Sequence, residues 1–329
     1  TIGFIGAGSF AQSNLLPNIP KKEKIILKGV ITASGTGSRT VADRFGFEFS
    51  TSNDKDIFED KEINTVFIAT RHDSHAQYVI KALKAAKHVF VEKPLCLREE
   101  ELNEIISTYN KLINSVKKPV LMVGYNRRFS ALSKILKKKT GHGKMAMIYR
   151  INAGPIPPDS WIQDPEIGGG RIIGEVCHFI DLIQYLTNSF PIRVYAETIS
   201  SDAHKSSDNV AITLKMQNGA IGSISYLAGG DKRYQRERIE VFGGGAVGVI
   251  ENFRKAFFIR NGKQHIKRNL LCIDRGHRSE LEAVISAILE KKSSPVDIEE
   301  YVATTLATFA IEQSLINGSP QIVDMESLQ

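Results

Sequence analysis

The chain has 329 residues, of which 42% are hydrophobic and 24% are charged, and its formal net charge at pH 7 is +7. This composition is typical of a globular protein, and the length predicts about two domains, each large enough for its own core. No apolar run approaches the roughly 18 residues of a membrane-spanning helix, so we expect neither a membrane span nor a signal peptide.

The cysteines and the positive charge limit the classes of binding site. Cys96, Cys177 and Cys272 are scattered singly, which predicts no disulfide framework, no metal site and a cytoplasmic location. The lysine run 137–139 contributes to the charge. Its lysines are either solvated surface residues or part of a surface that attracts an anionic ligand. Nucleic-acid binding is not expected, because no basic stripe is interleaved with aromatic residues.

The first 124 residues alternate apolar strand-like runs with amphipathic helical segments. The expected strands are 2–5, 25–33, 65–70, 88–91 and 119–124, and the expected helices are 41–45, 75–86 and 102–113. Strands of this kind show little period-2 polarity, which predicts a parallel sheet covered on both faces. We therefore expect a first α/β domain over residues 1–124. The chain begins directly with its first strand, which suggests a fragment of a longer protein.

The remaining residues, 125–329, have a different pattern. The expected strands are 145–152, 192–199, 209–216, 220–227, 238–242 and 256–260. Asn-Gly pairs at 218–219 and 261–262 predict hairpins between them. Two helices follow, 279–291 and 298–316, and Gly318 is suited to end the second. We expect an α+β domain with a mainly antiparallel sheet, and we leave open whether the last helix packs back on the first domain.

A glycine-rich turn joins the first strand to the first helix. Gly6 permits the tight turn, Gly8 allows a pyrophosphate to approach the backbone, and Ala11 is small enough for helix–strand packing. The helix N-terminus adds free N–H groups and a positive dipole end. The turn therefore predicts a dinucleotide site that also includes Ser9 and Phe10. The alternative is a structural turn that binds nothing.

The end of the second strand bears on the choice between NAD and NADP. An acid there would hold the ribose 2′-hydroxyl of NAD, but residues 32–39 contain none. Ser34 and Arg39 instead suit a 2′-phosphate, so we favour NADP. The alternative is that Arg39 only caps or solvates its helix, in which case NAD is acceptable.

The strand 88–91 runs into Glu92-Lys93-Pro94. In an open α/β sheet, the carboxyl ends of the strands are where ligands bind. Pro94 fixes its own φ and moves Lys93 out of the helical region. We therefore expect the Lys93 ammonium group to point into a ligand crevice.

These motifs resemble the Gfo/Idh/MocA family of sugar and inositol dehydrogenases. Residues 68–70 with His75, 85–95, 123–129, and 168–170 with His178 occur in the order typical of that family, and the resemblance covers nearly the whole chain. It implies an N-terminal Rossmann domain with a doubly wound parallel sheet and a C-terminal α+β domain with a large, mostly antiparallel sheet. It also implies a homo-oligomer formed through that sheet.

The resemblance extends the cofactor site beyond the glycine-rich turn. The further residues it implies are Thr70, His75, Glu92, Lys93 and Pro94. Of these, His75 is expected to support the top of the sheet rather than take part in the chemistry.

A narrower resemblance concerns residues 152–178. The segments 152–155, 159–161 and 170–178 are similar to the C-terminal module of bacterial two-part oxidoreductases, in which a zinc alcohol dehydrogenase-like module comes first. Such a fused module would explain the abrupt start at Thr1. By analogy, it implies a role in the biosynthesis of surface polysaccharides.

The implied catalytic pair is Lys93 and His178. Hydride transfer needs a group that takes the hydroxyl proton, for which an imidazole is suited, and Lys93 would stabilise the developing alkoxide. Many family members carry an aspartate four residues before the histidine, where this chain has Gly174. Glu175 is three residues from His178 and can touch it across a helical turn. Either Glu175 replaces the aspartate, or the proton relay differs, or activity is altered or lost.

Three further residues are candidates for substrate binding. Arg127 would grip an anionic part of the substrate, Trp161 would stack on a sugar face, and Asp181 shares a helix face with His178. The alternatives are that Trp161 only packs and that Asp181 only orients or caps a neighbour. Arg128 is expected to be an ion-pair partner.

The sequence thus predicts an NAD(P)-dependent oxidoreductase that acts on a secondary hydroxyl or ketone of a sugar, cyclitol or nucleotide sugar. One alternative is a cofactor-binding sensor without turnover, which Gly174 would favour. Another is an NAD-assisted glycosidase, which would release a second sugar product.

Overall fold

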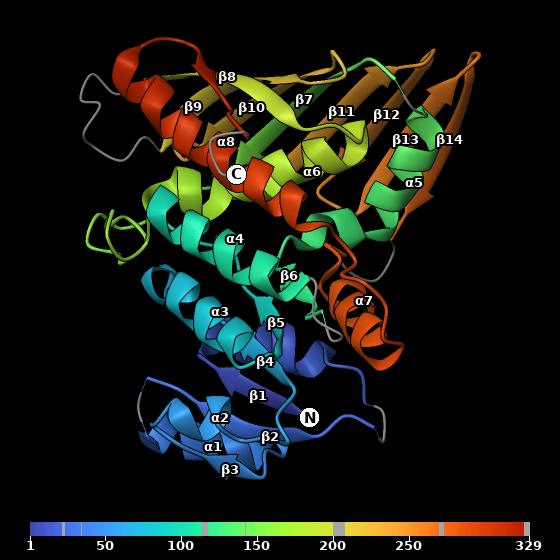
Figure 1. The fold of residues 1–329 in the computed structure, drawn as a ribbon. Helices are drawn as coiled ribbons and strands as arrows, with labels where there is room; N and C mark the ends of the chain where they lie inside the picture. The colour runs from blue at the N-terminus through green and yellow to red at the C-terminus, as the bar shows by residue number, and fades with distance from the viewer. Residues whose placement is uncertain are drawn as a thin grey trace. The chain divides into compact units, whose positions relative to one another are not determined.

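The structure is a computed structural model that describes residues 1–21, 24–33, 35–113, 118–141, 143–199, 208–269 and 273–325. Ser34 and Cys272 lie outside the described residues. The chain forms two compact units, shown in Figure 1. The first contains Thr1–Gly124 and His277–Ile298, and the second contains Tyr125–Gly276 and the residues from Glu299 onward.

Within its described residues, the first unit contains one parallel sheet with the strand order β3-β2-β1-β4-β5-β6. The strands are β1 (Ile2–Ile5), β2 (Leu27–Ile31), β3 (Phe49–Ser50), β4 (Thr65–Ile68), β5 (His88–Val91) and β6 (Leu121–Val123). This order confirms the expected doubly wound sheet, with its switch point between β1 and β4. All residues of β1 and β4 are buried, because helices cover both faces of the sheet.

The helices of this unit are α1 (Gly35–Phe45), α2 (Lys55–Phe58), α3 (His75–Lys84), α4 (Glu99–Ile113) and α7 (His277–Leu289), with short turns η1 (Ala11–Leu15), η2 (Leu16–Asn18) and η3 (His72–Ser74). The helix α1 begins six residues before the expected start at Val41. Its first turn consists of glycine and hydroxyl residues, which carry no apolar periodicity.

The helix α7 belongs to the first unit although the chain reaches it only after the second sheet. It contacts η1 and η2, and the ring of His277 lies edge-on to that of Phe10 at 6.1 Å. The last helix, α8 (Ile298–Asn317), belongs to the second unit apart from its first residue. The chain therefore returns to the first unit through α7.

The second unit contains a sheet with the strand order β14-β13-β12-β11-β7-β10-β9-β8-β15 in its described residues. All neighbours are antiparallel except β7 and β10, which are parallel, so the expected mostly antiparallel sheet is confirmed. The strands are β7 (Met145–Asn152), β8 (Pro191–Thr198), β9 (Asn209–Met216), β10 (Ile221–Leu227), β11 (Glu237–Gly243), β12 (Ala246–Glu251), β13 (Lys255–Arg260), β14 (Lys263–Arg268) and β15 (Gln321–Ile322).

Three of these strands were not expected from the sequence: β12, β14 and β15. All residues of β14 are exposed and most are polar, so the strand shows no apolar alternation. The strand β12 follows a run of three glycines, and β15 has only two residues.

Helices cover one face of this sheet. They are α5 (Ala131–Thr140), α6 (Cys177–Thr187) and α8, preceded by the turns η4 (Asn126–Phe129) and η5 (Ile172–Val176). Figure 1 shows α5, α6 and α8 on the same side of the strands. Residues Met147, Tyr149 and Ile151 of β7 are buried on the helix side, and the Tyr149 ring lies 4.9 Å from that of Phe179 in α6. Within the described part of the chain, no helix is both long and apolar enough to cross a membrane.

A buried ionic cluster fixes the start of this unit to its sheet. Glu237 in β11 has no exposed surface and accepts hydrogen bonds from Arg127 Nε at 2.8 Å, Tyr149 Oη at 2.6 Å and Arg275 Nε at 3.0 Å. Burial alone would raise the pKa of this carboxyl group, but Arg127 and the other donors lower it to about 2. The folded protein therefore holds Glu237 ionised.

We predict that Glu237→Gln lowers the free energy of unfolding at neutral pH by about 3 kcal/mol, because Arg127 loses its buried counter-charge. The folded pKa lies below the ordinary value of 4.5. The contribution of Glu237 is therefore complete above that value and is lost as the pH falls towards 2. Urea unfolding from pH 2 to 7 should show a flatter pH dependence in the variant.

The matched control for this measurement is Glu240→Gln, which removes a carboxylate of the same strand that is partly exposed and paired with Arg238. Such a pair contributes at most about 1 kcal/mol. Equal losses of unfolding free energy in the two variants would show that the buried cluster stabilises the fold no more than an exposed ion pair does.

Candidate active site

The glycine-rich turn has the geometry of a phosphate-binding turn. Gly6 has φ +90°, and a Cβ atom on it would lie 2.6 Å from the backbone of Ala69 and Thr70, so only glycine is accommodated. The N–H groups of Gly6 and Ala7 donate to the carbonyl of Ile31 in β2, which holds the turn between β1 and β2.

The space at Gly8 is suited to a bound pyrophosphate. A Cβ atom on Gly8 would meet nothing within 4 Å, so the backbone is open to a ligand there. A helical turn begins at Ser9, and the first N–H groups of a helix have no partner within it. Ala11 is buried, whereas Ser9 is exposed and Phe10 is 45% exposed. The residues of the turn thus match the needs of a dinucleotide.

The end of β2 is organised by hydroxyl groups. The Ser38 hydroxyl is buried and accepts a hydrogen bond of 2.8 Å from the backbone N–H of Thr32, whose own hydroxyl lies 3.0 Å from it. Arg39, one residue further along α1, is exposed. Ser38 was not among the expected site residues, since its role depends on a turn that brings it back to the end of β2.

The ends of β4 and β5 are joined by His75. Its Nδ1 lies 2.7 Å from the carbonyl oxygen of Pro94, and its Nε2 lies 3.3 Å from that of Thr70. Burial lowers the pKa of His75 to about 4, so the ring is neutral and donates from one nitrogen only. The shorter contact assigns the proton to Nδ1. His75 therefore has a structural role at this edge of the sheet.

Lys93 and Glu92 follow β5 directly. Lys93 is half-buried, and the peptide bond between it and Pro94 is cis. Glu92 is buried, and its carboxylate is so close to Gly124 that a Cβ atom there would be 3.0 Å away. Burial raises the pKa of Glu92 to about 7, although the charge of Lys93 opposes this shift. The two neighbours therefore present an ammonium group and a carboxyl group that titrates near neutrality.

In the second unit, His178 lies at the start of α6, directly after the π-helical turn η5. Its side chain is 8% exposed, and its ring lies edge-on to that of Tyr125 at 6.0 Å. Gly174 is buried within η5. Lys93 belongs to the first unit and His178 to the second, so the surroundings of each are described within its own unit.

Glu175 is held by a polar cluster. Its carboxylate accepts hydrogen bonds from the Tyr226 hydroxyl and from Arg236, and it lies 3.3 Å from Arg171 Nη2. Arg171 is buried and also donates to the Tyr226 hydroxyl at 2.5 Å. None of these three partners was expected from the sequence. Tyr226 and Arg236 lie more than 50 residues along the chain from Glu175, whereas Arg171 is four residues away and its helical spacing was a signal that could have identified it.

The expected substrate residues Arg127 and Asp181 are instead held in buried ion pairs. Arg127 forms two hydrogen bonds with Glu237, of 2.8 and 3.0 Å. Both oxygens of Asp181 accept hydrogen bonds from Arg128, at 3.0 and 2.6 Å, and Asp181 has no exposed surface. Burial raises the pKa of Asp181 to about 6, with Arg128 opposing the shift. The expectation that Arg128 is an ion-pair partner is confirmed.

This arrangement departs from the expected substrate contacts of Arg127 and Asp181. The sequence placed Asp181 on one helix face with His178, but it could not show which charged residue Arg127 or Asp181 would meet. Trp161 is partly exposed, and its carbonyl is so close to Gly168 that a Cβ atom there would be 2.4 Å away. Across the described ranges, no group of histidine, cysteine, aspartate and glutamate side chains is arranged to hold a metal ion.

Comparison with known proteins identifies the family. Residues 1–143 match the model of the oxidoreductase family with an NAD-binding Rossmann fold, and residues 135–247 match that of the GFO/IDH/MocA C-terminal domain. Myo-inositol 2-dehydrogenase of Thermotoga maritima is 26% identical over 80% of this chain and 78% of its own length. Levoglucosan dehydrogenase of Pseudarthrobacter phenanthrenivorans is 30% identical over 57% of this chain and 51% of its own length.

Solved structures agree with the fold. A levoglucosan dehydrogenase in complex with NADH and L-sorbose superimposes with a TM-score of 0.83 at 23% identity, covering 99% of each chain. The two matched models overlap at residues 135–143, within the second unit, and together cover residues 1–247. The chain therefore belongs to the Gfo/Idh/MocA family of NAD(P)-dependent oxidoreductases that act on CH–OH groups.

Proposed function

We propose that this protein transfers a hydride between a nicotinamide cofactor and a secondary hydroxyl or ketone of a sugar or cyclitol. The observation that carries the proposal is the pairing, within one unit, of an open phosphate turn at Gly8 with Lys93 at the end of β5. Relatives named for myo-inositol and levoglucosan support the substrate class. A nucleotide sugar is the larger substrate that a basic chain would also attract.

Each proposed catalytic side chain has one task. The nicotinamide, when bound, supplies or accepts the hydride. Lys93 donates a hydrogen bond to the substrate oxygen and stabilises the negative charge that develops there. His178 exchanges the proton of the same hydroxyl group.

Glu175 is proposed as a positioning residue. It lies one helical turn before His178, at the place nearest to the aspartate of other family members. Its carboxylate is shared with Arg171, Arg236 and Tyr226, so its charge is largely compensated. We propose that this cluster fixes the start of α6, and with it the orientation of the His178 ring.

The catalytic assignment predicts that Lys93→Met and His178→Ala each lower turnover by about 10²- to 10⁴-fold, because each removes a group that acts in the transition state. Steady-state rates with a panel of inositols and monosaccharides measure this effect. Cofactor affinity, followed by fluorescence titration, should be retained in His178→Ala. Lys111→Met, an exposed lysine of α4, is the matched control.

Full turnover in both variants would contradict the assignment. A wild-type protein that binds the cofactor but turns over no sugar would favour a sensor without activity, the role consistent with Gly174. Release of a second sugar product would instead identify NAD-assisted glycoside cleavage.

For the cofactor, we propose NADP in preference to NAD. Residues 32–39 contain hydroxyl residues and the exposed Arg39 but no acid, which suits a 2′-phosphate. We predict that NADPH binds at least tenfold more tightly than NADH, a difference of about 1.4 kcal/mol. Arg39→Ala should remove most of this preference while leaving NADH affinity unchanged. A tenfold preference for NADH in titrations of the wild type would overturn the proposal.

We also propose that the protein forms a homo-oligomer through the outward face of its second sheet. The register places one apolar row across five adjacent strands: Ile221, Ala146, Phe242, Val247 and Ile259. Ile221, Phe242 and Ile259 are each at least 40% exposed. An exposed apolar row of this length is typical of an association surface.

Phe242→Asp should dissociate the oligomer, because it introduces a charge into the centre of the row. Light scattering at micromolar concentration measures the mass, with Thr213→Asp on the polar part of the same face as the control. A wild-type monomer, or an oligomer of unchanged mass in both variants, would exclude this surface.

A further inference from the structure

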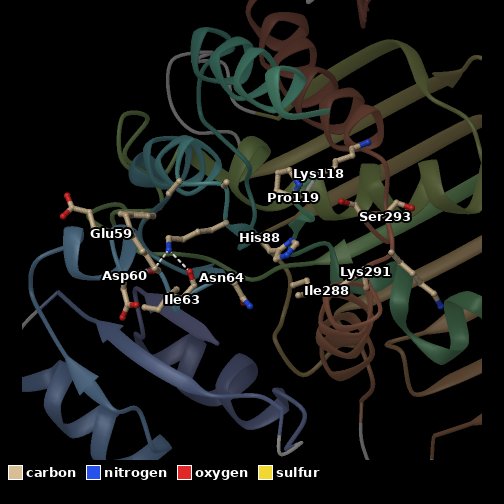
Figure 2. Close-up of a pocket in the computed structure, with 18 residues that line it drawn as sticks. Glu59, Asp60, Ile63, Asn64, His88, Lys118, Pro119, Ile288, Lys291 and Ser293 are labelled. Carbon is tan, nitrogen blue, oxygen red and sulfur yellow. Dashed lines mark hydrogen bonds between the residues drawn. The ribbon is translucent and has the colours of Figure 1, made fainter. Parts of the chain in front are cut away.

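The first unit contains a cavity of about 1020 Å³ that is not part of the proposed cofactor site (Figure 2). Its walls are the loop 58–64, the turn 85–88, Lys118 with Pro119, and the end of α7 with the following residues to Ser294. This volume is at the upper end of the range for small-molecule sites. Figure 2 shows His88 beside Pro119 and Ile288, with Lys118 and Lys291 around them.

The cavity lies at the opposite edge of the sheet from the phosphate turn. Asn64, Lys87 and Val120 directly precede β4, β5 and β6, so the cavity is at the amino ends of these parallel strands. The phosphate turn and Lys93 follow the carboxyl ends of β1 and β5. A ligand in the cavity would therefore not overlap the dinucleotide.

The cavity walls are joined to one another by buried hydrogen bonds. The Lys87 side chain is buried, and its Nζ donates to the carbonyl oxygens of Asp60 at 2.7 Å and Ile63 at 2.6 Å, as the dashed lines of Figure 2 mark. The backbone N–H of Leu121 donates to Ser294 Oγ at 3.1 Å. The loop 58–64, the turn before β5 and the segment after α7 thus hold their positions without a ligand.

His88 gives the cavity a neutral donor. Its Nδ1 accepts a hydrogen bond of 2.9 Å from the backbone N–H of Val120, so the proton of the neutral ring is on Nε2. Burial lowers the pKa of His88, which keeps the ring neutral at physiological pH. The remaining N–H is the polar group of an otherwise apolar wall that includes Pro119 and Ile288.

The charged lining favours an anion. Five lysines line the cavity against two acids: Lys61, Lys87, Lys118, Lys291, Lys292, Glu59 and Asp60. Asp60 is already paired with Lys28, at 2.8 Å, and Lys292 is paired with Glu290. In the part of the chain that the structure describes, Lys61 and Lys291 form no ion pair. Their ammonium groups are available to a ligand with more than one negative charge.

The helix α7 connects this cavity with the phosphate turn. Ala287 and Ile288, at its end, line the cavity. At its start, the His277 ring meets the Phe10 ring, and the helix packs on η1, which continues the glycine-rich turn. A helix of 13 residues is a rigid body about 20 Å long, so a shift at one end moves the other. We propose that the cavity is a second ligand site, which takes a small organic anion of two or more charges and acts through α7 on cofactor binding.

The test uses citrate and inorganic pyrophosphate as probes of the polycarboxylate and phosphate classes, at constant ionic strength, on protein saturated with NADPH. Isothermal titration calorimetry should detect one bound anion, and Lys118→Glu and Lys291→Glu should each weaken its binding at least tenfold. Lys111→Glu, an exposed lysine of α4 outside the cavity, should leave the affinity unchanged. The stronger probe identifies the chemical class.

A second measurement tests the link through α7. The dissociation constant of NADPH should change about fivefold or more when the cavity is saturated with the stronger probe, and the effect must be reciprocal. Lys291→Glu should abolish this change while leaving NADPH affinity without probe intact. The proposal fails if neither probe binds the NADPH-saturated protein, if Lys118→Glu and Lys291→Glu bind as the wild type does, or if NADPH affinity does not respond.

Discussion

The fold of the cofactor site depends on one close approach, in which the backbone of Gly6 meets that of Ala69 and Thr70 without room for a side chain. This contact joins the turn after β1 to the end of β4. His75, at the start of α3 after β4, then donates from Nδ1 to the carbonyl oxygen of Pro94, which follows β5. The neighbouring strands β1, β4 and β5 thus end at one edge of the sheet, where the open glycine-rich turn follows β1 and Lys93 follows β5.

Charged side chains of the second unit form two kinds of contact that the sequence does not distinguish: fully buried ion pairs and a partly exposed polar cluster. Arg127 and Arg128 are adjacent, yet each ends in its own buried carboxylate, Glu237 or Asp181. A buried charge that loses its partner strongly destabilises the folded protein. These two arginines are therefore needed for stability, and their charges are already compensated by protein carboxylates. Glu175 differs, because it is partly exposed and shares its charge with residues from two other segments.

The sequence was sufficient for those features that are encoded locally. The alternation of strands and helices predicted the parallel sheet, and the glycine spacing predicted the turn at Gly6 and Gly8. It was insufficient where a role depends on a distant partner: Glu237 lies 110 residues from Arg127, and no local pattern links them. Nor does any pattern show that α7 packs on η1, because its apolar residues would fit either unit.

The surroundings of Glu92 complicate any kinetic reading of the active site. A carboxyl group with a pKa of about 7 stands next to Lys93, within the range in which an imidazole normally ionises. If the turnover rate changes with pH near neutrality, the change could then come from Glu92 or from His178. A pH profile of the turnover rate recorded with Glu92→Gln separates the two sources, because a change that persists in this variant cannot come from Glu92.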